Sequence, residues 1–163
     1  MSEKQKISVL MSVYIKENPT FLKDAIESVQ NQTLKPSELV LVEDGPLTPE
    51  LYQVLDQLEA ESDIPVKRYP LEQNQGLGLA LRQGVLQCQY DIIARMDTDD
   101  IAVPDRFEKQ VQLMEKENLD LLGGHIAEFI DNPDEIVSYR RVPTQHADIV
   151  AYQRMRSAFN HMT

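Results

Sequence analysis

The sequence predicts an α/β fold with three layers, in which helices cover both faces of a mostly parallel central sheet. Short runs rich in Val, Ile and Leu alternate with longer segments whose apolar residues recur at helical spacing. Such alternation is typical of β-α units, whose parallel strands are covered by the connecting helices. No linker-like segment interrupts the pattern, so we expect one domain over residues 1–163.

Two β-α units open the chain. The apolar run 7–14 predicts the first strand, and Asn18-Pro19 predicts the N-cap and first turn of a helix. The run 39–42 predicts the second strand, and Thr48-Pro49 marks the start of a second helix. The later part of the chain continues the alternation with strands expected at 66–69, 90–96 and 119–122, a helix from about 77 to 87, and a helix starting at Pro104. From Asp131 onward the pattern weakens.

Composition narrows the functional classes. The net charge of -11 would repel a nucleic-acid backbone, so DNA and RNA are not expected partners. The single cysteine, Cys88, cannot form an internal disulfide, and residues 1–6 do not resemble a secretory signal, which favours the cytoplasm. No stretch approaches the roughly 20 apolar residues that cross a bilayer, although peripheral association with a membrane stays compatible with the sequence.

An acidic cluster follows the fourth predicted strand. Residues 97–100 read Asp-Thr-Asp-Asp, directly after the apolar run 90–94 and Arg95-Met96. Ligands of open α/β sheets bind outside the carboxyl ends of the strands, and carboxylates there suit Mg²⁺ or Mn²⁺ bound together with a diphosphate. The alternative is that these residues only cap the next helix. A calcium loop is rejected, because Ile101 and Ala102 occupy its ligand and glycine positions.

A second polar group follows the second predicted strand. The carboxylates of Glu43 and Asp44 could accept hydrogen bonds from a nucleotide base or ribose, although Asp-Gly-Pro is also a common turn. Ser12 and Tyr14 end the first strand, where Tyr14 could stack on a base or simply belong to the core. All these residues are expected at one edge of the sheet.

Five motifs in register together resemble a family 2 glycosyltransferase. They are Ser8-Val9-Leu10-Met11-Ser12-Val13-Tyr14, Glu27-Ser28-Val29-Gln30-Asn31-Gln32-Thr33, Val42-Glu43-Asp44-Gly45, Asn74-Gln75-Gly76-Leu77-Gly78 and Asp97-Thr98-Asp99-Asp100. The resemblance covers roughly residues 6 to 130. It implies the Rossmann-like GT-A fold, a nucleotide-diphosphate sugar donor and inversion at the anomeric carbon.

The resemblance also implies roles for single residues. Ser12 and Tyr14 would border the base, and Asp44 would accept a hydrogen bond from a uracil ring, which favours UDP. Glu43 stands where the family often has another aspartate. Asp99 is the expected direct ligand of Mn²⁺ or Mg²⁺, with Asp97 nearer the ribose or sugar of the donor and Asp100 a weaker candidate.

The family's general base is an acidic residue well downstream of the metal motif, so we expect it beyond Thr163. His125 and His146 are candidates by residue type alone, and surface or packing roles fit them better. We therefore expect the chain to be the donor-binding, N-terminal part of a longer protein, with donor binding and little or no transfer.

The residues around Arg95-Met96-Asp97 and Val42-Glu43-Asp44-Gly45-Pro46 most resemble those of bacterial family members that build exopolysaccharide, capsule or lipopolysaccharide. Such enzymes work at the cytoplasmic face of the inner membrane. The expected acceptor is a saccharide or a lipid-linked saccharide. A non-catalytic module that binds a nucleotide sugar and a metal is the main alternative. A phosphoacceptor domain would need its carboxylates after the first strand, and a dinucleotide-binding enzyme would need a third glycine where Leu81 stands.

Overall fold

The computed structural model describes residues 5–163, which separate into two compact units. One unit ends at Gln112, and the other runs from Leu113 to Thr163. The expectation of a single domain over the whole chain stays a prediction. Among the residues described, no helix combines the length and the apolar sequence needed to cross a bilayer.

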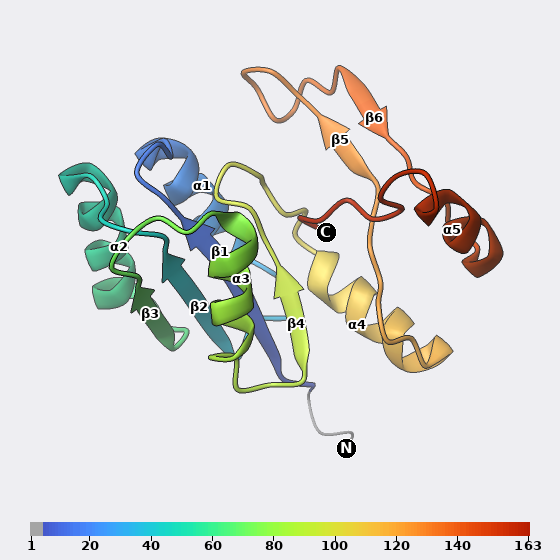
Figure 1. The fold of residues 1–163 in the computed structure, drawn as a ribbon, viewed down its shortest axis with the longest axis horizontal. Coiled ribbons are helices and arrows are strands. Elements are labelled where there is room, and N and C mark those ends of the chain that lie inside the picture. Colours follow the sequence, from blue (N-terminus) through green and yellow to red (C-terminus); the bar gives the residue numbers. More distant parts are fainter. Residues whose placement is uncertain (1–4) are drawn as a thin grey trace. The chain divides into compact units, whose positions relative to one another are not determined.

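A four-stranded parallel sheet forms the centre of the first unit (Figure 1). Its strands are β1 (Ile7–Val13), β2 (Glu38–Glu43), β3 (Val66–Pro70) and β4 (Ile92–Arg95). Their order across the sheet is β3-β2-β1-β4, and each neighbouring pair is parallel. The first four strands predicted from the sequence are confirmed, with β4 shorter at both ends than the predicted run 90–96.

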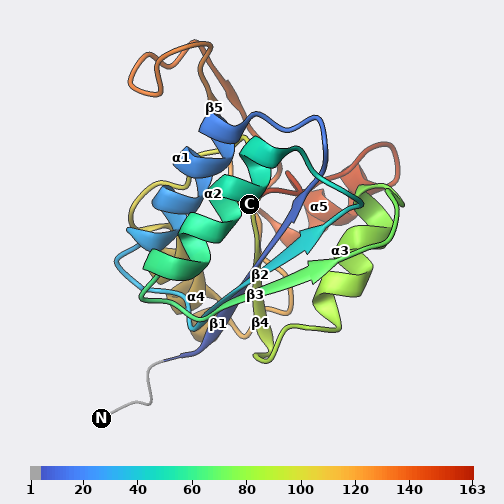
Figure 2. The same cartoon turned by 90° about the vertical axis from the view of Figure 1, so that its left-hand side faces the viewer.

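Helices cover both faces of this sheet, as Figure 2 shows. One face packs against α1 (Pro19–Gln30), α2 (Pro49–Glu61) and the first turns of α4 (Arg106–Glu117), and the main hydrophobic cluster lies there. The other face packs against α3 (Leu77–Val85) through a smaller cluster that contains Leu10, Val40, Val42 and Ala80. The predicted three-layer α/β/α arrangement is therefore confirmed for this unit.

The predicted helix starts also form. Asn18 Oδ1 accepts a hydrogen bond from the Thr20 N–H at 2.8 Å, and Thr48 Oγ1 accepts one from the Leu51 N–H at 3.3 Å. Each contact satisfies one of the N–H groups that a first helical turn leaves without a partner. The third helix ends at Val85, two residues before the predicted end, and α4 begins at Arg106, two residues after Pro104.

The second unit contains a two-stranded antiparallel sheet and one helix. Strands β5 (Ile126–Glu128) and β6 (Ser138–Arg140) pair, and α5 spans His146–Gln153. The predicted strand at 119–122 is wrong. Within the described chain no strand pairs with residues 119–122, and the side chain of Leu121 is exposed. The apolar residues of this segment therefore do not form a buried strand. The strands form instead around Asp131, where the pattern weakens.

Candidate functional site

The carboxyl ends of β2, β1 and β4 meet at one edge of the sheet, because the three strands are adjacent and parallel. The backbone N–H of Asp44 donates to Val13 O at 2.8 Å, and that of Met96 donates to Leu10 O at 3.1 Å. These bonds extend the pairing just past the ends of β2 and β4. The sites predicted from the three strand ends therefore share this edge.

The acidic turn after β4 places three carboxylates together. One carboxylate oxygen from each of Asp97, Asp99 and Asp100 lies within 4.8 Å of the other two. Asp99 is exposed, and Asp97 and Asp100 are partly buried. Carboxylate oxygens are hard ligands, so this set fits Mg²⁺ or Mn²⁺ better than a softer metal. The structure brings Asp97 and Asp99 together, and their binding of a metal stays a prediction.

Two arginines balance the charge of this turn. Arg95 Nη1 forms an ion pair with Asp97 Oδ1. Arg106 Nη2 donates to Arg95 O at 2.8 Å, and its Nε donates to Gln110 Oε1 at 3.0 Å. Burial lowers the pKa of Arg106 to about 10, against the raising effect of Asp100 and with a further lowering by Arg95. The guanidinium of Arg106 therefore remains charged at neutral pH.

Glu17 is a neighbour of the acidic turn that the sequence patterns do not indicate. It lies in the loop between β1 and α1, and its side chain hydrogen-bonds the buried Thr98. Burial raises the pKa of Glu17, the bond to Thr98 lowers it, and the charges of Asp99 and Asp97 raise it, with a net rise. The only sequence signal is its place in the loop after a strand whose end borders β4.

Asp44 ties the loop after β2 to the start of α3. Its Oδ1 accepts from the Gln75 N–H at 2.7 Å, and its Oδ2 accepts from the Gly76 N–H at 3.0 Å. The Asp44 side chain is buried. The third and fourth of the five sequence motifs are thus hydrogen-bonded to each other, which their separation in the chain does not reveal.

Glu43 is also buried, and its partner comes from the neighbouring strand. Arg68 Nε donates to Glu43 Oε1 at 2.6 Å, and Arg68 Nη1 contacts Asp56 Oδ1 at 2.6 Å. Asp56 belongs to α2, so Arg68 links β2 to that helix. Glu43 lies at the predicted edge, but the partner that the structure gives it is a protein side chain.

The remaining predicted residues divide between the two units. Ser12 is half-buried in β1, and Tyr14 is exposed just after it, where a flat ligand could reach its ring. His125 and His146 belong to the second unit. The Nδ1 atom of His125 accepts a hydrogen bond from the Val142 N–H at 3.3 Å, and His146 is the first residue of α5.

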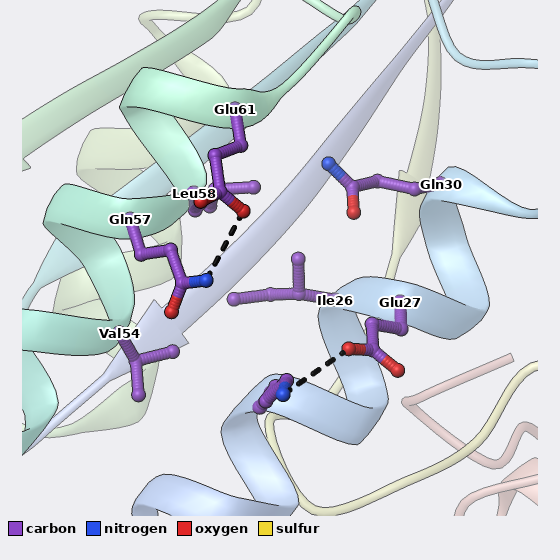
Figure 3. Close-up of a pocket in the computed structure, with 8 residues that line it drawn as sticks. Ile26, Glu27, Gln30, Val54, Gln57, Leu58 and Glu61 are labelled. Carbon is purple, nitrogen blue, oxygen red and sulfur yellow. Dashed lines mark hydrogen bonds and ion pairs between the residues drawn. The ribbon is translucent and has the colours of Figure 1, made fainter.

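A pocket between α1 and α2 is separate from these residues (Figure 3). Its base is apolar, and an ion pair and a hydrogen bond within the two helices border it. The lining consists of Lys23, Ile26, Glu27, Gln30, Val54, Gln57, Leu58 and Glu61. None of the residues predicted to bind nucleotide or metal lines it, so we place the candidate site at the strand ends.

The chain belongs to the family described as glycosyl transferase family 2, which matches residues 8–162. It is 52% identical over 159 residues to an uncharacterized glycosyltransferase of Haemophilus influenzae. It is 42% identical over 156 residues to the amylovoran biosynthesis glycosyltransferase AmsE of Erwinia amylovora. It is 39% identical over 157 residues to the UDP-Gal:alpha-D-GlcNAc-diphosphoundecaprenol beta-1,3-galactosyltransferase of Escherichia coli. These matches cover 97%, 95% and 96% of the chain but 59%, 57% and 56% of the relatives.

Two solved structures share the fold. Residues 1–349 of TarS from S. aureus, in complex with UDP, match with a TM-score of 0.60 at 20% identity, over 70% of this chain and 33% of that one. The mannosyltransferase PcManGT from Pyrobaculum calidifontis, in complex with GDP-Man and Mn²⁺, matches with a TM-score of 0.61 at 15% identity, over 69% and 33%. At these identities the likeness shows the fold alone, and the predicted GT-A fold is confirmed.

Proposed function

We propose that this chain binds the donor of a glycosyltransferase that moves a sugar from a UDP-linked donor to a saccharide or lipid-linked saccharide during cell-surface polysaccharide synthesis. The observation that carries the proposal is the group of three carboxylates after β4, beside the ends of β1 and β2. The name of the E. coli relative supports UDP and a lipid-linked acceptor, and the name of the Erwinia relative supports polysaccharide synthesis. If the acceptor is linked to a lipid, the enzyme would work at the cytoplasmic face of the inner membrane, and we propose peripheral contact with that membrane.

The proposed metal ligands are Asp99 and Asp97, with Asp100 beside them. A bound Mn²⁺ or Mg²⁺ would neutralise negative charge on the donor's diphosphate as it leaves. The proteins found with UDP or with GDP-Man and Mn²⁺ support this choice of ligands only by analogy of fold.

The proposed nucleoside contacts lie at the ends of β1 and β2. Tyr14 is exposed enough to pack against a base, and Ser12 borders it. Each oxygen of the Asp44 carboxylate can accept more than one hydrogen bond, so its bonds to Gln75 and Gly76 leave capacity for a uracil N–H. A contact of Glu43 with the nucleotide stays a prediction, because its carboxylate already pairs with Arg68.

Inversion at the anomeric carbon requires the acceptor oxygen to attack opposite the leaving diphosphate while a base takes its proton. We assign this base to no residue of the described chain. The contribution proposed for residues 5–163 is therefore to hold the donor and orient its diphosphate.

Calorimetric titration with UDP, with and without Mn²⁺, tests the proposal on the chain and on Asp99→Ala. We expect binding that needs Mn²⁺ and is lost in Asp99→Ala. The matched control is Asp134→Ala, which removes an exposed aspartate from a turn of the second unit. Equal UDP binding in Asp99→Ala and Asp134→Ala, or no binding by the folded chain to UDP, would contradict the proposal, and titration with GDP would then test another nucleotide.

A further inference from the structure

Arg95 is the last residue of β4, two positions before the proposed metal ligand Asp97. Its side chain is 14% exposed, and its Nη1 forms the ion pair with Asp97 Oδ1. The Nε and Nη2 atoms are buried, and within residues 5–163 neither has a hydrogen-bond partner. The guanidinium of Arg95 is thus held by its ion pair with Asp97.

The main chain of Arg95 is held independently of its side chain. Its N–H and C=O lie in the strand that pairs with β1, and its carbonyl oxygen also accepts from Arg106 Nη2 at 2.8 Å. Arg106 is anchored in turn to Gln110 within α4. The guanidinium of Arg95 therefore extends from a fixed backbone, which makes it suited to fix the side chain that it contacts.

Asp97 needs such a partner. Three carboxylates with oxygens within 4.8 Å of one another repel when all are ionised. A buried arginine is stable only with a counterion, and the pair with Asp97 satisfies this need while placing one carboxylate of the group. Side chains that contact metal ligands in this way commonly set the orientation of those ligands.

We propose that Arg95 is a positioning residue that holds the Asp97 carboxylate in the orientation required for binding a divalent cation beside Asp99. The inference rests on the proposed function and assigns Arg95 a role through Asp97, with no contact to the cation. The proposed role and simple electrostatics predict opposite changes in cation affinity when Arg95 is replaced. Loss of a positive charge near a cation site should strengthen cation binding by simple electrostatics, whereas loss of a positioning residue should weaken it.

Titration of Mn²⁺ alone, with free Mn²⁺ measured by electron paramagnetic resonance, separates these two effects. The full chain is compared with Arg95→Met, Asp97→Asn, the double variant and the charge-matched control Arg154→Met, an exposed arginine of the second unit. We expect Arg95→Met to weaken Mn²⁺ binding about 10- to 100-fold. The double variant should bind no more weakly than Asp97→Asn, and Arg154→Met should bind as the parent chain does.

Mn²⁺ binding by Arg95→Met that equals or exceeds that of the parent chain overturns the inference, as does a parent chain that binds no Mn²⁺. If Arg95→Met does not fold, Arg95→Lys decides in its place, because lysine keeps the charge but lacks the planar fork. The inference is supported if Arg95→Lys weakens Mn²⁺ binding in the parent chain but not in Asp97→Asn. It is overturned if Arg95→Lys binds Mn²⁺ with the affinity of the parent chain. UDP titration tests the proposed function separately, so failure to bind UDP with an intact Mn²⁺ effect would reject that function alone.

Discussion

The carboxylate of Asp44 binds the backbone of Gly76, with 3.0 Å between Oδ2 and the Gly76 nitrogen. Its other oxygen accepts from the Gln75 N–H at 2.7 Å, and the Asn74 side chain donates back to Asp44 O at 3.3 Å. Gly76 is the N-cap of α3 and provides no side-chain cap. Asp44 therefore supplies a negative charge at the N-terminus of this helix, where the helix dipole favours it.

Asp44→Ala should destabilise the protein by about 1–3 kcal/mol, because the substitution removes the buried acceptor of the Gln75 and Gly76 N–H groups, whose hydrogen bonds are partly buried. Asp44→Asn should cost less, because its one amide oxygen can still accept. Urea denaturation measures both. An alanine variant as stable as Asp134→Ala would show that the contacts with Gln75 and Gly76 contribute little, leaving nucleotide binding as the principal reason for an aspartate here.

Gly45→Ala should also destabilise, by about 1–3 kcal/mol or more. Gly45 has a φ of 86°, and an added Cβ would lie 2.6 Å from the backbone nitrogen of Asn74, which cannot move aside like a side chain. Gly78→Ala is the matched control, because its Cβ would meet no atom within 4 Å and α3 favours alanine by about 0.5–1 kcal/mol. Thermal unfolding should therefore shift in opposite directions, and a shared direction would contradict this account.

The sequence predicts the layered fold well because helix caps and apolar periodicity act locally. Asn18 and Thr48 cap their helices through bonds that span two or three residues. The strand predicted at 119–122 does not form, because a short apolar run does not indicate whether another strand is present to pair with it. The weak pattern around β5 and β6 has the same origin, since β6 is exposed along its whole length and buries no face.

The sequence indicates which residues of the candidate site follow which strands. It does not indicate which side chains and backbone groups these residues contact. Asp97 and Asp99 are recognisable because they directly follow a strand. The bonds of Asp44 to Gly76 and of Glu43 to Arg68 join positions far apart in the chain, so spacing carries no sign of them. Glu17 is hidden for the same reason, because its relation to Thr98 depends on the pairing of β1 with β4.

Stability should fall in acid partly through Glu38. Burial raises the pKa of this carboxyl, but bonds from Lys67, Ser8 and the Gln89 N–H outweigh it, and the net pKa is lowered. A folded-state pKa below the unfolded one stabilises the fold above the ordinary glutamate pKa of about 4.3 and loses this contribution as the pH falls through the folded value.

Glu38→Gln should therefore be less stable than the parent chain near neutrality, and the gap should narrow as the pH falls below about 4.3. Urea denaturation across this range measures the gap, with the exposed Glu72→Gln as control. A gap that stays constant with pH would show that the lowered pKa of Glu38 does not contribute to stability.

The pair of Arg68 and Glu43 should show the asymmetry of a buried ion pair. Glu43 is 4% exposed at its side chain, so Arg68→Met should cost about 3–5 kcal/mol by leaving its charge without a partner. Replacing both residues, as Arg68→Met with Glu43→Leu, should restore much of this loss because no buried charge remains. The control is Lys35→Met, which breaks the exposed pair with Asp63 and should cost at most about 1 kcal/mol. Urea denaturation of the parent chain and the three variants measures these losses. Equal losses for Arg68→Met and Lys35→Met would mean that water, and not Arg68, compensates the charge of Glu43.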